Sequence, residues 1–224
     1  MDVSITPHDL FGTVEAISSK SYAHRALICA SFANGTTNIT CPYISDDIQV
    51  TVECLKVLGT TIARTKQGFR VVPAKEQNRP QSAQLNCKES GTTLRFILPL
   101  LGALNIKATI TAEGRLFSRP LEPLISELSA HGMSFTWLNK NLLEVSGQLV
   151  SGSFELPGDV SSQFISGLLL ALPLLDKPSA IQIVSPIQSK DYLSITEQVM
   201  SDFGVTTSFE VKSSTYTITS QHYV

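Results

Sequence analysis

Three stretches of this 224-residue chain follow one plan, in which polar residues stand at the start of an apolar helix. In each stretch that helix is followed by a strand-like run and then by a second helix that ends at glycine. The stretches begin at Ser21, Ser90 and Ser161, about 70 residues apart, which suits a βαβαββ unit better than a small solenoid repeat. A repeated unit places equivalent helix starts on one face of a fold, and helix starts attract anions. The pattern therefore predicts a face where anion-binding groups gather.

The two helices of each unit differ in their apolar pattern. The first is apolar or small on every side, which indicates burial on every side. These runs span 26–33, 96–104 and 164–175. The second is amphipathic, and its terminal glycine suits the left-handed residue that ends many helices. The second helices are expected over 45–59, 118–132 and 190–204, with Pro120 at the first helical position of the middle one.

Strand-like runs rich in β-branched and aromatic residues lie between and after these helices. They span 36–40, 60–64, 69–72, 107–112, 134–138, 142–145, 180–184, 206–211 and 216–219. We therefore expect an α/β (α+β) fold of three βαβαββ repeats, about 19–84, 85–150 and 151–224, with buried central helices and outer sheets. Residues 1–18 fit no repeat and are predicted to be strand material without a partner.

Composition indicates a globular protein and excludes several classes of function. Hydrophobic residues make up 42% of the chain and charged residues 16%, and the formal net charge of -2 argues against general nucleic-acid binding. The longest apolar stretch is too short to span a bilayer, and the N-terminal residues do not resemble a secretory signal. The four cysteines and four histidines show no metal-binding or redox spacing, so we expect no metal and a reduced, cytoplasmic protein.

The start of the first helix carries two cations and a hydroxyl. Lys20 and Arg25 flank it, and Ser21 is placed to cap its N-terminus. Free backbone N–H groups, the helix dipole and both cations favour an anion there. One such helix end contributes only about 0.3–1 kcal/mol, whereas several that converge would form a strong site. The alternative is that Lys20 and Arg25 are solvated surface charges.

The second unit starts with a run rich in glycine and hydroxyl groups, Ser90-Gly91-Thr92-Thr93. Gly91 would let a ligand approach the backbone closely. Further along, Arg115 and Arg119 bracket a turn and suit bidentate pairing with a carboxylate or phosphate. The alternatives are a plain N-cap for the first feature and ion pairs with neighbouring glutamates for the arginines.

In the third unit, hydroxyl and amide groups start both helices. Ser161, Ser162 and Gln163 precede the apolar helix, while Ser189 and Tyr192 mark the start of the last one. Such groups ligate phosphate and sugar-like hydroxyls without adding charge, although simple capping is the alternative for each. The functional interpretation depends on the coincidence of five helix starts with anion-binding groups across the three repeats. The sequence has no Ser-His-Asp arrangement, Walker loop or dinucleotide fingerprint.

Five separated motifs occur in an order that resembles the EPSP synthase (3-phosphoshikimate 1-carboxyvinyltransferase) family. They are Ser19-Lys20-Ser21 with Arg25, Ser90-Gly91-Thr92-Thr93 with Arg95, Arg115 with Arg119-Pro120, Ser161-Ser162-Gln163, and Ser189-Lys190 with Tyr192. The resemblance covers the whole chain but only the N-terminal half of the family's length. It implies a domain of the enolpyruvyl transferase-like inside-out α/β barrel, acting in the shikimate pathway of aromatic amino acid biosynthesis.

That family transfers the enolpyruvyl group of phosphoenolpyruvate to the 5-hydroxyl of shikimate 3-phosphate and needs no metal or organic cofactor. The residues that the resemblance implies at phosphoenolpyruvate are Lys20, which would be catalytic, Gly91, Arg115 and Gln163. Those implied at shikimate 3-phosphate are Ser21, Arg25, Ser161, Ser162, Gln163, Ser189 and Tyr192. Both substrates are polyanions, so fixed cations and helix ends would position them.

The chain departs from the family pattern at two motifs and in length. Ala16-Ile17-Ser18 stands where Pro-Gly is usual, and Glu89 stands where many members have Asn, so no ligand role is expected of Glu89. Family members carry a second domain that supplies acid/base residues and further cations. The resemblance implies that residues 1–18 pair with that domain and that 19–224 form the N-terminal domain. The chain alone is then expected to bind shikimate 3-phosphate weakly and to be catalytically inert.

Two other functions stay open from the sequence. UDP-N-acetylglucosamine enolpyruvyl transferase shares the fold, but it has Lys-Asn at the first motif and a loop cysteine. Here Ser21 follows Lys20, and no cysteine lies between Arg115 and Arg119. The other alternative is a non-catalytic α/β repeat domain used for binding or assembly.

Overall fold

The computed structural model describes residues 3–4, 6–9 and 11–224. Its α-helices are α1 (Lys20–Phe32), α2 (Asp46–Val57), α3 (Gly91–Ala103), α4 (Leu124–Ala130), α5 (Ser162–Ala171) and α6 (Lys190–Asp202). Its 3-10 helices are η1 (Glu76–Asn78), η2 (Leu116–Ser118) and η3 (Leu172–Leu174). Its strands are β1 (Thr37–Thr40), β2 (Thr61–Arg64), β3 (Gly68–Val72), β4 (Ser82–Asn86), β5 (Lys107–Thr111), β6 (Ser134–Asn139), β7 (Leu142–Ser146), β8 (Ser153–Leu156), β9 (Ser179–Ile183), β10 (Ser208–Glu210) and β11 (Thr215–Ile218).

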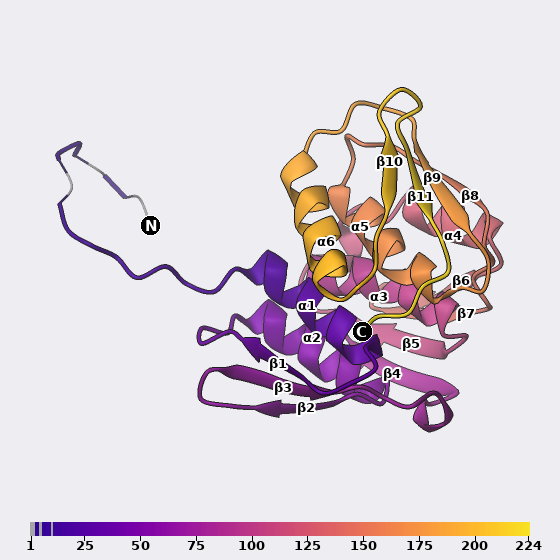
Figure 1. Ribbon diagram of the computed structural model, residues 1–224, viewed down its shortest axis with the longest axis horizontal. Helices are drawn as coiled ribbons and strands as arrows, with labels where there is room; N and C mark the ends of the chain where they lie inside the picture. The colour runs from indigo at the N-terminus through magenta and orange to yellow at the C-terminus, as the bar shows by residue number, and fades with distance from the viewer. Residues whose placement is uncertain (1–2, 5, 10) are drawn as a thin grey trace.

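Each sheet is built from one of the predicted repeats, apart from β4, which begins just before the boundary expected at residue 85 (Figure 1). The strand orders are β1-β3-β2, β4-β5-β7-β6 and β10-β11-β9-β8. The pairs β4–β5 and β8–β9 are parallel, and the other neighbours are antiparallel. The second and third units therefore have the full βαβαββ order, which confirms the predicted fold class. In the first unit the described residues form no strand before α1, so β1 lacks the parallel neighbour that β5 and β9 have.

The sequence patterns did not predict β4 or β8. Their sequences, SAQLN and SFEL, are short and contain no β-branched residue, so local propensity for a strand is low. Both strands alternate exposed and buried side chains, because one face packs on the core. Each is joined to its parallel partner by a helix, α3 or α5, so pairing across the crossover organises the strand.

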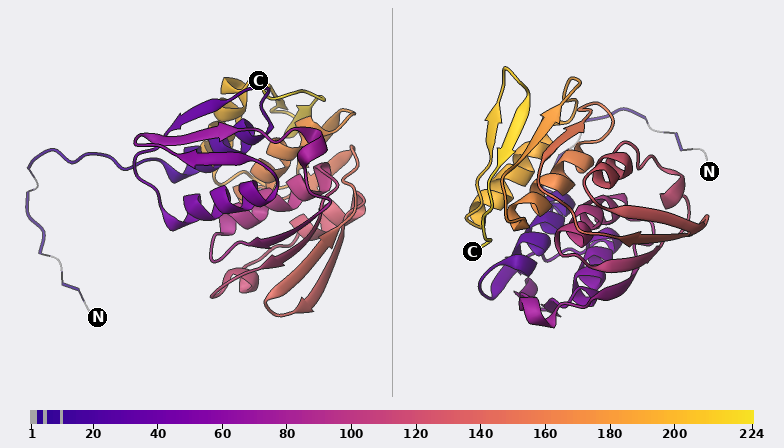
Figure 2. Two further views of the ribbon diagram at one scale, coloured as in Figure 1. Left: turned by 90° about the horizontal axis from the view of Figure 1, so that it is seen from below. Right: turned by 90° about the vertical axis from the view of Figure 1, so that its right-hand side faces the viewer.

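The predicted apolar helices lie at the centre, and the sheets lie outside them (Figure 2). α3 and α5 pack along each other, while α1 packs against α2 and α6. Leu27, Phe96 and Phe164, one from each of the apolar helices, are fully buried. α5 ends at Ala171 rather than near residue 175, because η3 follows with Pro173, which has no N–H for the helical ladder.

The second helices end as predicted, but one begins later. The terminal glycines have positive φ angles of 101° at Gly59, 98° at Gly132 and 75° at Gly204, which confirms their left-handed conformation. The middle helix, α4, starts after Pro123 and not at Pro120. The reason is that a proline disfavours helical backbone in the residue before it, so the second proline delays the start.

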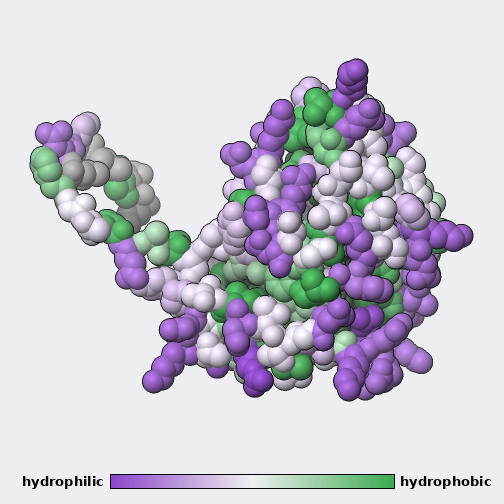
Figure 3. All heavy atoms as spheres, in the orientation of Figure 1, coloured by the Kyte–Doolittle hydropathy of each residue, from purple (hydrophilic) through white to green (hydrophobic). Residues whose placement is uncertain are grey.

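The described residues of the N-terminal segment form no strand within this chain, and for residues 1, 2, 5 and 10 the strand prediction lies outside the described residues. The segment extends away from the body (Figure 1), and its apolar side chains stand in the open (Figure 3); Phe11 and Val14 are 93% and 92% exposed. The end of the segment next to α1 is held by Tyr43, whose N–H donates to Ser18 Oγ and whose hydroxyl donates to Glu15, each at 3.1 Å. A strand needs a neighbour for its N–H and C=O groups, and this segment has none within the described part of the chain.

Candidate functional site

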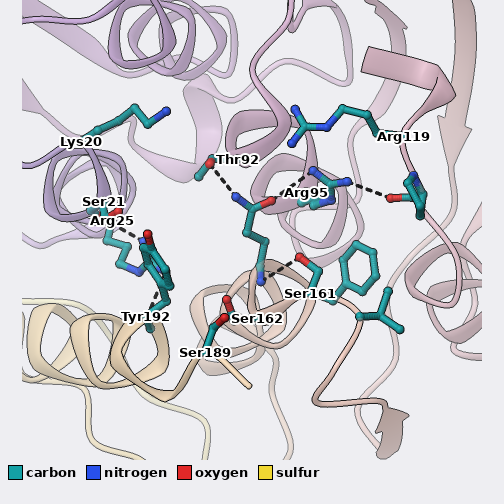
Figure 4. Close-up of a pocket in the computed structure, with 14 residues that line it drawn as sticks. Lys20, Ser21, Arg25, Thr92, Arg95, Arg119, Ser161, Ser162, Ser189 and Tyr192 are labelled. Carbon is teal, nitrogen blue, oxygen red and sulfur yellow. Dashed lines mark hydrogen bonds between the residues drawn. The ribbon is translucent and has the colours of Figure 1, made fainter. Parts of the chain in front are cut away.

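The starts of α1, α3, α5 and α6 surround a cavity of about 490 Å³. The predicted site residues that line it are Lys20, Ser21, Arg25, Ser161, Ser162, Gln163, Ser189 and Tyr192. The other lining residues are Thr92, Arg95, Arg119, Pro120, Val160 and Phe164. Figure 4 shows Lys20 and Arg119 extending toward one another from opposite sides. The predicted gathering of helix starts is therefore present in the structure.

Two predicted residues, Arg115 and Gly91, do not line the cavity. Arg115 is exposed at the start of η2, and Arg119 reaches the cavity in its place. Gly91 lies beside the cavity cations, because an added Cβ would be 2.6 Å from Arg95 Nη1 and 2.8 Å from Arg119 Nη1. Its missing side chain allows two guanidinium groups to approach the start of α3.

The acidic residues near this turn are engaged elsewhere. Glu113 accepts a hydrogen bond from Asn86 Nδ2 at 3.2 Å, and Glu122 accepts one from the Ser126 hydroxyl at 2.6 Å. Within the described chain neither forms the ion pair with Arg115 or Arg119 that the sequence left open. Glu89 folds against Gly114, where an added Cβ would collide with its carboxylate, and does not line the cavity.

Serine hydroxyls differ in their roles at the helix starts. Ser19, and not Ser21, caps α1, since its Oγ accepts the Tyr22 N–H at 3.5 Å. Ser21 lies inside the first turn and lines the cavity. Ser161 caps α5, whereas Ser189 precedes α6 without a side-chain capping bond. The hydroxyls of Ser21 and Ser189 are therefore not used as caps.

Arg25 is buried, with 2% of its surface exposed, which excludes a solvated surface role. Its Nε donates to Thr196 Oγ1 at 2.6 Å, and its Nη1 donates to the Ser21 carbonyl at 2.9 Å. Its Nη2 donates to Ser166 Oγ and to the Tyr192 carbonyl, each at 3.1 Å. These bonds use four of the five guanidinium hydrogens, so one hydrogen on Nη1 is left for a ligand at the cavity.

Arg95 connects the other side of the cavity. Its Nη1 donates to Gln163 Oε1 at 3.1 Å and to the Gly91 carbonyl at 3.3 Å, and its Nη2 donates to the Pro120 carbonyl at 2.8 Å. The Gln163 amide in turn donates to Thr92 Oγ1 at 2.8 Å. No role for Arg95 is predicted from the sequence, although an arginine inside an apolar helix needs buried partners, and its place there could have pointed to a site. Arg95 holds the turn that carries the neighbouring cavity arginine.

The cavity has an excess of positive charge. Lys20 pairs with Asp47 at 2.6 Å, but among the ion pairs of the described residues none involves Arg25, Arg95 or Arg119. Burial lowers the pKa of Arg25 to about 10, and burial together with the positive charge of Arg119 lowers the pKa of Arg95 to about 10. The guanidinium groups remain charged at neutral pH, so a bound anion would stabilise them.

Within residues 3–4, 6–9 and 11–224 no helix is long and apolar enough to cross a membrane. No three His, Cys, Asp or Glu side chains in these ranges gather as a metal site would require.

Replacing Gly91 with alanine is expected to weaken binding of an anion such as inorganic phosphate about tenfold, because the new methyl group displaces two guanidinium ends that supply charge-assisted hydrogen bonds. Both obstructing atoms end flexible side chains, so the thermal midpoint should stay within a few degrees. Calorimetric titration and a melting curve on the same sample check this. A large fall in the midpoint would instead indicate a backbone clash.

A model of the family described as EPSP synthase (3-phosphoshikimate 1-carboxyvinyltransferase) matches residues 5–222. The chain is 41% identical over 204 residues to a 3-phosphoshikimate 1-carboxyvinyltransferase of Clostridium kluyveri and 36% identical over 211 residues to one of Clostridium beijerinckii. These matches cover 91% of this chain and 48% of each relative. The chain therefore spans about half the length of the curated relatives it matches.

Solved structures have the same fold. An EPSP synthase from Acinetobacter baumannii superposes with a TM-score of 0.77 at 23% identity, covering 93% of this chain and 46% of that one. The enolpyruvyl transferase NikO from Streptomyces tendae gives 0.67 at 17% identity, covering 96% of this chain and 49% of the other. These structural similarities support the fold of this chain, while the family model and the curated relatives identify its family. The chain belongs to the EPSP synthase (3-phosphoshikimate 1-carboxyvinyltransferase) family.

Proposed function

We propose that this chain is the N-terminal half of an enzyme that transfers the enolpyruvyl group of phosphoenolpyruvate to the 5-hydroxyl of shikimate 3-phosphate, releasing inorganic phosphate. The observation that carries the proposal is the cavity at four helix starts, where Arg25, Arg95 and Arg119 have no carboxylate partner among the described residues. Both substrates are phosphorylated carboxylates, so each brings the charge that such a cavity lacks. Family membership favours this function over the two alternatives.

Shikimate 3-phosphate would bind between α1, α5 and α6. The free Nη1 hydrogen of Arg25 suits the substrate carboxylate, together with the uncapped Ser21. Hydroxyl groups suit a phosphate because they donate without adding charge. Those proposed at the phosphate are Ser161, Ser162 and Ser189, with Gln163 and Tyr192 against the ring.

Phosphoenolpyruvate would bind between Lys20 and the start of α3 at Gly91, in reach of Gln163. We move the role expected of Arg115 to Arg119, because Arg119 lines the cavity and Arg115 does not. Protonation of the methylene carbon of phosphoenolpyruvate creates a cationic centre, and the 5-hydroxyl attacks this centre as it loses its proton. Phosphate then leaves and the new methyl group gives up a proton, which restores the double bond. Cations on both sides would hold the reacting groups in place as charge moves.

We also propose that a second domain completes the site, because the match covers only 48% of the length of each relative. Among the described residues no carboxylate lines the cavity, so acid and base groups would come from that domain. The open edge of β1 and the exposed apolar residues before α1 support it. We propose that residues 1–18 pair with the second domain and that 19–224 form the N-terminal domain. The free, buried cysteines are compatible with a cytoplasmic setting.

Calorimetry on the chain alone tests the half-site. Shikimate 3-phosphate is expected to bind at up to millimolar concentration, whereas UDP-N-acetylglucosamine is not. A chain that binds the nucleotide sugar, or neither ligand, contradicts the proposal. Phosphate release at enzyme-like rates from the chain alone would contradict the need for a second domain.

Replacing Arg119 with alanine is expected to weaken binding of phosphoenolpyruvate at least tenfold, since a charge-assisted hydrogen bond contributes about 1.5–3 kcal/mol. Arg115 is the matched control, because its replacement removes the same charge from the same turn outside the cavity. We expect that control to bind within about twofold of the unchanged chain. The reverse ranking in the titrations would return the role to Arg115.

A further inference from the structure

Lys20 is held at the rim of the cavity by a residue that does not line it. Its ammonium group donates to Asp47 Oδ2 at 2.6 Å, and Asp47 lies in the first turn of α2. The lysine side chain is 50% exposed and the aspartate 29%, so the pair sits at the edge of solvent. An ammonium group has three hydrogens, so the bond to Asp47 leaves two for a ligand.

The backbone that carries Asp47 is itself fixed by a buried chain of polar groups. One turn further along both helices, His24 Nδ1 bonds to Thr51 Oγ1 at 2.7 Å. Thr51 bonds to Thr93 Oγ1 at 2.6 Å, and Thr93 bonds to Ser90 Oγ, the N-cap of α3, at 2.7 Å. All four residues are at most 1% exposed. These hydrogen bonds fix the first turns of α1, α2 and α3 relative to one another. The position of Asp47 beside Lys20 is therefore set by this buried network as well as by the ion pair itself.

We propose that Asp47 is a positioning residue for Lys20, in the site to which the proposed function assigns phosphoenolpyruvate. A free lysine side chain loses much conformational entropy when a ligand immobilises it. Because Asp47 fixes the ammonium group before the ligand arrives, that entropy is lost on folding and not on binding. The two remaining hydrogens then point from a defined place to the incoming anion.

Charge alone predicts the opposite effect of Asp47. A carboxylate near an anion site repels the anion, so its removal by itself would strengthen binding. Asp46 provides the comparison, since it stands in the same first turn of α2, is exposed, and forms no ion pair among those found in the described residues. Replacement of either aspartate by asparagine changes the net charge equally, but only one replacement releases Lys20.

The experiment is calorimetric titration of phosphoenolpyruvate and inorganic phosphate into the unchanged chain and its Asp47→Asn and Asp46→Asn variants, with melting curves for each. We expect Asp47→Asn to bind both ligands about fivefold more weakly, which is the largest effect typical of a partly exposed ion pair. Asp46→Asn should bind them as tightly as the unchanged chain or more tightly. Asp47→Glu, which keeps the carboxylate, should recover most of the loss. A double-mutant cycle with Lys20→Met should remove the effect of Asp47→Asn, because the effect acts through the lysine.

The outcomes separate this inference from the function on which it rests. An unchanged chain that binds neither ligand overturns the proposed site and the role of Asp47 with it. An unchanged chain that binds, while Asp47→Asn binds equally or more tightly, overturns the positioning role alone. A loss that persists in the Lys20→Met background also overturns it, because Asp47 would then act on the fold and not on the lysine.

Discussion

Lowering the pH from 7 to 4.5 is expected to remove about 2.5 kcal/mol from the free energy of unfolding through His24 alone. This side chain is 1% exposed, its Nδ1 is bonded to Thr51, and its Nε2 has no hydrogen-bond partner among the described residues. A charged imidazole at this place would lose its hydration without a compensating bond. The ring is therefore neutral in the folded protein at neutral pH.

The direction follows from the pKa of His24 in the two states. Burial lowers the pKa from 6.5 to about 4; Asp47 raises it, whereas Lys20 and Arg25 lower it. Between these pH values the unfolded chain binds more protons than the folded one, so stability rises with pH and is lost as pH falls. At about 1.4 kcal/mol per pKa unit, the shift from 6.5 to about 4 has a full effect of about 3.5 kcal/mol, reached below both pKa values.

Denaturant titrations at several pH values between 4.5 and 7 measure this contribution. His24→Asn keeps polar atoms near Thr51 but does not titrate, so its stability should fall less steeply with acid by about 2.5 kcal/mol. His222 is exposed, and His222→Asn should follow the unchanged protein. Parallel curves for the unchanged protein and His24→Asn would show that His24 does not titrate abnormally.

Replacing Gly167 with alanine is expected to destabilise the protein by about 2 kcal/mol. Gly167 lies where α5 crosses α3, and an added Cβ would be 2.6 Å from the Arg95 carbonyl oxygen and 3.3 Å from Pro99 Cγ. The obstacle is backbone, so the central helices must separate. The loss from overpacking exceeds the gain of about 1 kcal/mol that alanine brings to a helix.

Gly35→Ala is the matched control for this prediction. In the described part of the chain no atom lies within 4 Å of a Cβ placed on Gly35, so its replacement should leave stability unchanged or slightly raised. Because α3 carries Arg95 and α5 carries its partner Gln163, Gly167→Ala should also weaken anion binding. Equal denaturation midpoints for the two variants would show that α3 and α5 are not closely packed at this point.

Local sequence patterns predicted the features that depend on interactions between residues close together in the chain. The apolar runs identified the three central helices, and Gly59, Gly132 and Gly204 ended the second helices as expected. The repeat also predicted that helix starts gather, because equivalent segments of equivalent units lie on one face. For that reason Lys20 and Arg25 could be named before their surroundings were known.

The choice between similar neighbours needed the tertiary structure. Arg115 and Arg119 stand in the same turn, and only the course of the chain through η2 brings one of them to the cavity. The strands β4 and β8 have weak propensity and form because distant strands pair with them.

By itself, then, the sequence determined the repeated architecture, its buried helices and an anion-seeking face. Tertiary structure decided which side chains meet there and what holds them. The bond from His24 to Thr51 spans 27 positions and the next, to Thr93, spans 42. No local pattern encodes such contacts, because they depend on how three helices pack side by side.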